Sequence, residues 1–337
     1  MQNLTLFTEK EKKLLLKKRK GESKFGEHTK LLNNLTNIYE DINSLDVKYV
    51  LFGIKEDIGV YANYGKTGTY NAWEAAIKVL LNTQNNSFTN ANSILVLGHL
   101  DYSEQREIIS AKPKKKNISK ARSLVEDIDK DVSFLVSSII AAGKIPIIIG
   151  GGHNNAYGNI KGAALGLNNN INVVNFDAHS DFRAEEGRHS GNGFSYAFTE
   201  GFLNNYFIFG LHENYTSNNL FKSLNKIKNI KFNTFEAIEV RKEIDFKSEM
   251  KAALKHISDK NFGIEIDCDA IENISSSAMS PSGFSVNQAR EFVHYFGSHN
   301  NSTYLHICEA APNEENETLV GKLISYLITD FVRANGN

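Results

Sequence analysis

Asn175-Phe-Asp-Ala-His-Ser-Asp181 places Asp177, His179 and Asp181 two residues apart, directly after an apolar run at residues 171–176. In extended backbone, side chains at this spacing point to the same side of the chain. Packing does not explain three ligand-type side chains that converge at the end of a strand, although an N-capping aspartate with a solvated loop remains an alternative. We interpret the stretch as a metal site and expect other strands to supply matching ligands.

Length and composition limit the class of protein. The chain has 337 residues, of which 41% are hydrophobic, so it can bury a sizeable core. A net charge of −1 gives no electrostatic case for a nucleic acid or a membrane surface as the main partner. The two cysteines, Cys268 and Cys308, lie in apolar strand-like runs, as expected of buried free thiols in a reducing compartment. Without a recognisable signal peptide or membrane span, we expect a cytoplasmic protein.

From residue 47 onward, short β-rich runs alternate with helix-length segments. The predicted strands are residues 47–54, 93–97, 145–149, 171–176, 206–209, 262–266 and 304–308. The predicted helices are residues 73–81, 119–142, 156–167, 247–257, 286–296 and 319–332. This alternation predicts an α/β fold with a mostly parallel central sheet and helices on both faces. No repeat or Pro-rich linker divides the chain, so we predict a single domain at residues 46–335.

Residues 1–45 form a charged N-terminal arm or helix in this interpretation. Their lysine-rich run at residues 9–20 is diluted by glutamates, which favours an exposed helix over a site for an anionic partner. A Gly-Lys-Thr at residues 65–67 is also not a nucleotide-binding loop. Such a loop needs four residues between its glycines, whereas Gly59 and Gly65 enclose five.

Three further strand ends carry ligand-type side chains. Residues 147–153 run from a strand through three glycines to His153, and these glycines let the backbone turn sharply over the strand end. Open α/β sheets bind ligands along that edge. The strand at 262–266 leads into Asp267 and Asp269, two carboxylates that are costly side by side unless a cation lies between them. Glu309 follows the last strand and reaches the same edge.

The charges of these residues balance two divalent ions. Four aspartates and two neutral histidines make up the predicted ligand set: His153, Asp177, His179, Asp181, Asp267 and Asp269. Oxygen and nitrogen ligands without a thiolate suit Mn²⁺ and are compatible with Fe²⁺, Co²⁺ or Zn²⁺. We therefore expect a binuclear centre.

Four motifs in this order resemble the arginase/agmatinase/formimidoylglutamase family of ureohydrolases over roughly residues 47–330. They are Gly-Gly-Gly-His (150–153), Asp-Ala-His-Ser-Asp (177–181), Asp-Cys-Asp (267–269) and Glu-Ala-Ala-Pro (309–312). Residues 56–60 and 188–194 are most similar to the formimidoylglutamase branch. The resemblance implies a three-layer, arginase-like α/β sandwich, a di-manganese centre and a homo-oligomer.

Carried over to this chain, the resemblance also implies roles for the ligands. Asp177 and Asp267 would bridge two ions, one of which is completed by His153 and Asp181 and the other by His179 and Asp269. A hydroxide that bridges the ions would be the nucleophile. Glu309 would pair with the cationic C–N group of the substrate.

Departures from the family pattern bear on the substrate. Arginases carry a proton-shuttling histidine where this chain has Phe194, and an aspartate that binds the α-amino group where it has Tyr215. Both differences count against arginine and favour N-formimidoyl-L-glutamate, with Asp269 as the proton relay to the leaving nitrogen.

The two carboxylates of that substrate call for cations. Arg183 and Arg188 are the predicted contacts, although either could be a surface residue paired with a glutamate. Asn192 and Phe194, in the same loop, and Glu309 complete the predicted substrate-binding set. We interpret His99, His294 and His306 as structural.

The sequence thus predicts a manganese-dependent hydrolase of histidine degradation that converts N-formimidoyl-L-glutamate and water to L-glutamate and formamide. Its partner would be this small molecule, with no nucleic acid and no membrane. Two alternatives stay open: a ureohydrolase of arginine, agmatine or a guanidino acid, and a catalytically silent metal-binding homologue. Asp267-x-Asp269 also resembles the metal-binding pair of glycosyltransferases, but that reading leaves His153, Asp177, His179 and Asp181 unexplained.

Overall fold

The computed structural model describes residues 2–109 and 115–336. These residues form one sheet of ten strands. The strand order is β1-β4-β3-β5-β10-β9-β6-β7-β8, and β2 also pairs with β4. Only β1 runs antiparallel to its neighbour among the described pairs. The strands are β1 (Leu4–Leu6), β2 (Lys30–Leu31), β3 (Tyr49–Lys55), β4 (Ile94–Asp101), β5 (Ile145–Ile149), β6 (Ile171–Phe176), β7 (Leu203–Leu211), β8 (Ile230–Thr234), β9 (Phe262–Asp267) and β10 (Ser302–Cys308).

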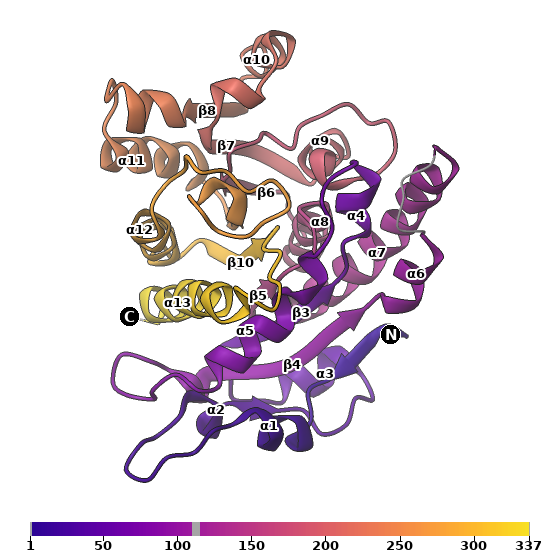
Figure 1. The fold of residues 1–337 in the computed structure, drawn as a ribbon, viewed down its shortest axis with the longest axis vertical. Helices are drawn as coiled ribbons and strands as arrows, with labels where there is room; N and C mark the ends of the chain where they lie inside the picture. Colours follow the sequence, from indigo (N-terminus) through magenta and orange to yellow (C-terminus); the bar gives the residue numbers. More distant parts are fainter. Residues whose placement is uncertain (1, 110–114, 337) are drawn as a thin grey trace.

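Helices cover both faces of the sheet, as Figure 1 shows with α11, α12 and α13 on one side and α7, α8 and α9 on the other. The described α-helices are α1 (Glu9–Leu15), α2 (Phe25–His28), α3 (Ile38–Asn43), α4 (Ile58–Ala62), α5 (Ala72–Leu80), α6 (Ser103–Ile108), α7 (Lys115–Ala141), α8 (Asn155–Leu167), α9 (Gly193–Thr199), α10 (Asn218–Leu224), α11 (Phe246–Ile257), α12 (Val286–Gly297) and α13 (Glu317–Asn335). The predicted α/β fold with a mostly parallel sheet is confirmed, and each predicted strand and helix is present with bounds that differ by a few residues.

Two hydrophobic clusters fill the space between the layers. One lies between the sheet and α5, α11, α12 and α13, and the other between the sheet and α3, α4, α7, α8 and α9. In α13 the buried apolar residues recur three or four positions apart, as at Val320, Leu323, Ile324 and Leu327, which is the pattern of a helix with one apolar face. The chain is thus a three-layer sandwich whose parallel strands are buried on both sides.

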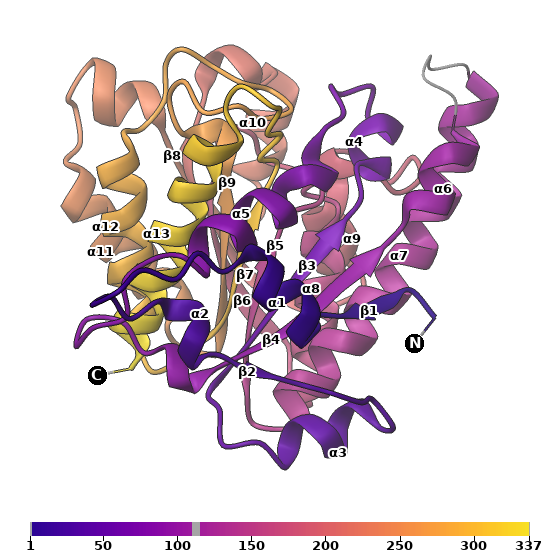
Figure 2. The same ribbon diagram turned by 60° about the horizontal axis from the view of Figure 1, so that its bottom comes forward.

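The N-terminal strands β1 and β2 both lie against β4 (Figure 2). Helix α1 has no buried residue and begins with a capping box between Thr8 and Glu11, in keeping with the expected exposed charged helix. Phe7 and Phe25, however, are buried in the core, and β1 and β2 both pair with β4. These strands were not predicted because they span only two or three residues. The domain boundary at residues 45 and 46 stays a prediction.

The glycine turn after β5 has the conformation that its sequence predicts. Gly150 and Gly151 adopt positive φ angles of 82° and 73°, which strain any residue with a Cβ atom. A Cβ atom at Gly151 would lie 2.3 Å from Nδ2 of Asn155 and 2.8 Å from Oε1 of Glu56. The buried Glu56 side chain therefore packs directly against this turn. Its Oε1 also accepts a hydrogen bond from the Gly152 N–H at 2.7 Å.

None of the helices in the described ranges combines the length and the apolar character that crossing a lipid bilayer requires.

We expect Gly151→Ala to lower the free energy of unfolding more than Gly201→Ala. Gly201 has a similar φ of 81° but open space around its Cα atom, so its substitution costs only the left-handed conformation, about 1–2 kcal/mol. Crowding at Gly151 should add about 1–3 kcal/mol. Chemical denaturation of both variants measures the difference, and equal losses would contradict this account of the turn.

Candidate metal centre

The predicted ligands lie at the carboxyl ends of neighbouring parallel strands. β5, β10, β9 and β6 are adjacent in the sheet, and they lead into His153, Glu309, Asp267 and Asp177 respectively. Because parallel strands end on the same edge, the four segments deliver their side chains to one place. Asp181 reaches it through a loop in which its own φ is 44°, rather than by simple extension of β6.

The first cluster surrounds the Nδ1 atom of His153. That atom lies 2.9 Å from Asp181 Oδ2, 3.1 Å from Asp267 Oδ2 and 3.3 Å from Asp177 Oδ2. One ring N–H cannot serve three carboxylates, so hydrogen bonding alone does not account for the arrangement. Bonds of about 2.1 Å in an octahedral site put neighbouring ligand atoms about 3.0 Å apart. The donor set and its spacing therefore fit a divalent cation.

The second cluster consists of Asp177, His179 and Asp269. The Nδ1 atom of His179 lies 2.9 Å from Asp269 Oδ2 and 3.7 Å from Asp177 Oδ1. Asp177 thus offers one oxygen to each cluster, as a bridging ligand would. Asp267 belongs only to the first cluster, where its Oδ2 lies near His153, while its Oδ1 accepts a hydrogen bond from the Asp269 N–H. Its predicted role as a second bridge stays a prediction.

Burial makes the charge of these carboxylates costly. Burial and the nearby Asp269 and Asp177 raise the pKa of Asp267 well above its ordinary value. Burial and Asp177 raise the pKa of Asp181 to about 6, and burial raises that of Glu309 to about 8. Without cations, protons compensate the negative charge, and divalent ions can take their place.

A cleft of about 440 Å³ opens above the two clusters. This volume falls within the roughly 300–1,000 Å³ of small-molecule sites. Asp267, Asp269, His179 and Glu309 form its polar floor, and the segments around α4 and around residues 215–220 and 277–278 form its walls. The cleft can therefore hold a small molecule against the ligand clusters.

Glu309 faces this cleft with one oxygen free. Its backbone has a φ of 58°, and its Oε1 accepts a 2.6 Å hydrogen bond from the His153 N–H. Its Oε2 is buried without a hydrogen-bond partner. A buried carboxylate oxygen that lacks a donor is costly, so it is prepared to accept one from a bound molecule.

Arg183 is the single arginine or lysine that lines the cleft in the part of the chain described here. Its side chain is 54% exposed, and its Nη1 donates a 2.7 Å hydrogen bond to Asn63 Oδ1. Asn63 in turn donates to the Ser190 hydroxyl at 3.1 Å. Arg183 therefore lies at the wall of the cleft, and its contact with a substrate stays a prediction; Asn63 is a neighbour that the sequence did not reveal.

Arg188 and Asn192 do not line the cleft, so their prediction as substrate contacts is wrong. Arg188 is buried in an ion pair with Asp129, at 2.8 Å from Nε to Oδ2, between the rings of Tyr157 and Tyr196. Asn192 accepts hydrogen bonds from Arg188 Nη1 and the His189 N–H, and its amide donates to loop carbonyls. Both residues hold the loop together.

Phe194 also lies outside the cleft, contrary to the prediction. Its ring is fully buried, stacks on Tyr206 with ring centroids 4.5 Å apart and contacts the His153 ring edge-on at 5.1 Å. Phe194 thus supports a ligand from behind instead of contacting the substrate. Tyr215, by contrast, lines the cleft and stacks on His179 at 5.3 Å.

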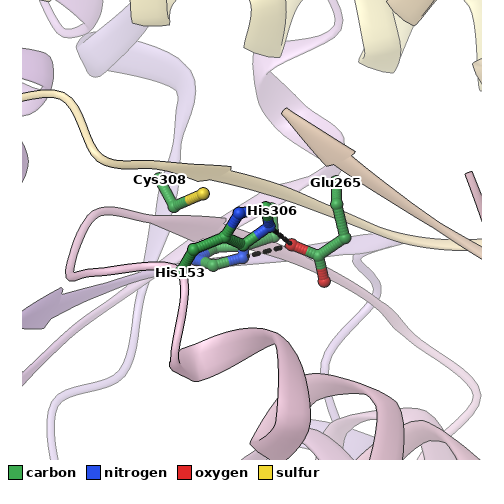
Figure 3. A group of neighbouring side chains, drawn as sticks. All are labelled: His153, Glu265, His306 and Cys308. Atoms are coloured by element: carbon green, nitrogen blue, oxygen red, sulfur yellow. Dashed lines mark hydrogen bonds and ion pairs between the residues drawn. The ribbon is translucent and has the colours of Figure 1, made fainter. Parts of the chain in front are cut away.

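A second group behind His153 was missed (Figure 3). It contains Glu265, His306 and Cys308, which are all fully buried on β9 and β10. His306 had been interpreted as structural. The available signal was Glu265 itself, a charged residue in the middle of the apolar run Phe262-Gly-Ile-Glu-Ile.

Comparisons with known proteins agree with this architecture. The family model of the Arginase family matches residues 48–332. Formimidoylglutamases of Streptococcus pyogenes serotypes M3 and M5 are 30% identical over 198 residues, which covers 56% of this chain and 55% of those proteins. The chain therefore aligns with about half the length of these curated relatives.

Solved structures share the fold over most of the chain. Formimidoylglutamase from Bacillus subtilis has a TM-score of 0.73 at 18% identity, covering 94% of this chain and 93% of that one. Formiminoglutamase from Trypanosoma cruzi with Mn²⁺ has a TM-score of 0.68 at 20% identity, covering 88% and 97%. A hypothetical agmatinase from Burkholderia thailandensis has a TM-score of 0.65 at 14% identity, covering 85% and 86%.

We expect the protein to bind two Mn²⁺ ions, Asp269→Asn to bind one and Asp177→Asn to bind neither tightly, because only Asp177 belongs to both clusters. Elemental analysis after gel filtration measures the bound ions. Asp259→Asn, just before the opposite end of β9, is the control and should retain both. Two ions in Asp177→Asn would contradict the shared ligand.

Proposed function

Because this chain belongs to the arginase family, we propose that it is a metal-dependent hydrolase of linear amidines whose substrate is N-formimidoyl-L-glutamate. The observation that carries the proposal is the pair of ligand clusters that share Asp177 on the floor of a small cleft, beside the free Oε2 atom of Glu309. Similarity to formimidoylglutamases over 56% of the chain supports the choice of substrate.

Two divalent ions, with Mn²⁺ as the proposed metal, would be held by His153, Asp177, His179, Asp181, Asp267 and Asp269. When bound, such a pair supplies the Lewis acidity that makes water a nucleophile near neutral pH. Ligands of oxygen and nitrogen type suit Mn²⁺, and Mn²⁺ is also the ion of the Trypanosoma cruzi structure.

Glu309 and Asp269 would act on the reacting group directly. The cationic amidine N–H donates to the free Oε2 of Glu309, which holds the electrophilic carbon over the floor of the cleft. The Oδ1 atom of Asp269 also has no hydrogen-bond partner and lies at the same floor. We assign it the transfer of a proton from the attacking water to the leaving nitrogen, which becomes the amine of glutamate while the carbon, with the oxygen of that water, leaves in formamide.

Arg183 would bind a carboxylate of the glutamate tail. It is held at the cleft wall by Asn63, and a guanidinium matches a carboxylate in two parallel hydrogen bonds. Serine hydroxyls around the cleft, from Ser180, Ser217 and Ser277, provide further donors for the second carboxylate.

A guanidino substrate is the second candidate, because the cleft offers one arginine where the proposed substrate has two carboxylates. Arginine, agmatine or a guanidino acid would use the same floor and the same Glu309. A silent metal-binding homologue is the third, and it predicts two bound ions without turnover. Roles in histidine degradation, a cytoplasmic location and a homo-oligomer are predictions that accompany the proposed reaction.

We expect the Mn²⁺-loaded protein to release formamide and glutamate in equal amounts from N-formimidoyl-L-glutamate, and Asp177→Asn to release neither. Urea release from arginine, agmatine and guanidinobutyrate is measured beside it. Urea without formamide would keep the metal chemistry and overturn the substrate. Two bound ions with no product from any of these compounds would support the silent homologue.

We expect Arg183→Gln to raise KM for N-formimidoyl-L-glutamate about 10- to 100-fold with a smaller change in kcat, since the tail carboxylate is held equally in the ground and transition states. Arg241→Gln is the matched control, because Arg241 is 41% exposed, pairs with Glu213 and lies outside the cleft. Steady-state kinetics of both variants provide the measurement. An unchanged KM for Arg183→Gln would remove Arg183 from the substrate site.

A further inference from the structure

We infer that Glu265, held in place by Tyr304 and His306, is a positioning residue that fixes the His153 ring with its Nδ1 lone pair toward the first ligand cluster. Figure 3 shows the rings of His153 and His306 facing the Glu265 carboxylate. The inference rests on the proposed function, because it assigns to Glu265 the control of one of the two metal sites. Glu265 itself lies outside the ligand clusters around Asp177.

The strand register brings these side chains together. Glu265 of β9 pairs with His306 of β10, and Gly263 pairs with Tyr304. In parallel strands, paired residues point to the same face, so Glu265, His306 and Tyr304 lie on one side of the sheet. A Cβ atom at Gly263 would lie 2.2 Å from Cζ of Tyr304, so the glycine leaves the space that the tyrosine ring occupies.

Glu265 is held from two sides within the protein. Its Oε1 accepts a 2.8 Å hydrogen bond from the Tyr304 hydroxyl, and its Oε2 contacts Nδ1 of His306. The other ring nitrogen of His306 lies 3.3 Å from the carbonyl oxygen of Gly150, in the turn that leads to His153. Both nitrogens of His306 thus face oxygen atoms of the protein, and these two contacts fix the position of its ring beside Glu265.

The Nε2 atom of His153 faces this carboxylate. It is buried, has no hydrogen-bond partner and lies 3.5 Å from Oε2 of Glu265. An anionic oxygen at this distance favours an N–H over a lone pair on Nε2, even where the contact is too long for a good hydrogen bond. A neutral imidazole carries one N–H, so the lone pair is left on Nδ1, which is the atom among Asp177, Asp181 and Asp267.

A metal ion is the competing explanation for this group, because ligand atoms of His153, Glu265, His306 and Cys308 lie within 4.8 Å of one another. Both oxygens of Glu265 and both nitrogens of His306 are already engaged with protein groups, however. The Cys308 thiol also points to a carbonyl, at 3.5 Å from the oxygen of Ile266. The hydrogen-bond network is therefore the better account, and counting bound ions tests it.

The two predicted histidine ligands differ in their burial and in the partners of their Nε2 atoms. His153 is fully buried, whereas the His179 side chain is 33% exposed and stacks on Tyr215 at the cleft. No carboxylate contact to the Nε2 atom of His179 is found within the described residues. The effect of Glu265 should therefore fall on the ion held by His153 and leave the ion held by His179 in place.

Glu265→Gln tests this selectivity. The amide has the size of the carboxylate, but its N–H₂ group can donate to Nε2 of His153 and so favour the tautomer that carries a proton on Nδ1. We expect one of the two Mn²⁺ ions to bind about 10- to 100-fold more weakly and the other to be unchanged. Elemental analysis, titration calorimetry and the paramagnetic resonance signal, which changes from a coupled pair to an isolated Mn²⁺, give three readouts independent of turnover.

Glu249→Gln is the matched control. Glu249 lies on α11, and its Oε2 accepts a 3.1 Å hydrogen bond from Asn233, away from both ligand clusters. This variant should bind two ions like the unmodified protein. Glu265→Asp keeps the charge and should recover part of the affinity lost in Glu265→Gln.

The outcomes separate this inference from the proposed function. Unchanged affinities in Glu265→Gln would overturn the positioning role, and three ions in the unmodified protein would replace it with a metal site at Cys308. An unmodified protein that binds no ion would instead refute the proposed function. If Glu265→Gln does not fold, Tyr304→Phe removes only the hydrogen bond to Oε1 and should weaken the same ion about fivefold, whereas no change would contradict the inference.

Discussion

Buried negative charge in one place is the constraint on which the rest of this structure depends. Asp177, Asp181, Asp267, Asp269 and Glu309 converge at one edge of the sheet, and all are buried or nearly so. Their mutual repulsion and loss of hydration would destabilise the fold unless cations or protons compensate them. A parallel sheet suits this constraint, because adjacent strands end together and place the carboxylates around a common centre while the apolar strands below remain packed on both faces.

The backbone holds these carboxylates in a consistent way. The N–H groups of His179, Asp269 and His153 donate to Asp177 Oδ1, Asp267 Oδ1 and Glu309 Oε1, at 2.6, 2.8 and 2.6 Å. In Asp267 and Glu309 the bond fixes one oxygen and leaves the other directed at the first cluster or at the cleft, whereas both oxygens of Asp177 face a cluster. The site is therefore preorganised by main-chain donors, which cannot rotate away as side chains can. The His153 ring is constrained in a similar way, because Glu265 faces its Nε2 atom from the side opposite the first cluster.

The sequence predicts those parts of the structure that depend on local pattern. Apolar runs that end in His153, Asp177, Asp267 and Glu309 were sufficient to predict the four central strands β5, β6, β9 and β10. They also predicted that these four residues converge. Arg188 was misassigned because its direction is set by Asp129, which lies far away in the sequence on α7. A tertiary partner of this kind leaves no periodic signal in a single sequence. The edge strand β8, Ile-Lys-Phe-Asn-Thr, was not predicted because it spans five residues and contains only two apolar ones.

The floor and the walls of the cleft have different structural origins, and they separate the residues that would determine the reaction from those that would select the substrate. The floor is built by strand ends, whereas Arg183, Asn63 and Tyr215 come from loops that can vary without disturbing the sheet. Phe194 does not distinguish between the candidate substrates, because its ring packs behind His153 and against Tyr206, away from the cleft. The proposal of a substrate with an anionic tail therefore rests on Arg183 at the cleft wall. The proposal of the reaction rests on the two ligand clusters on the cleft floor.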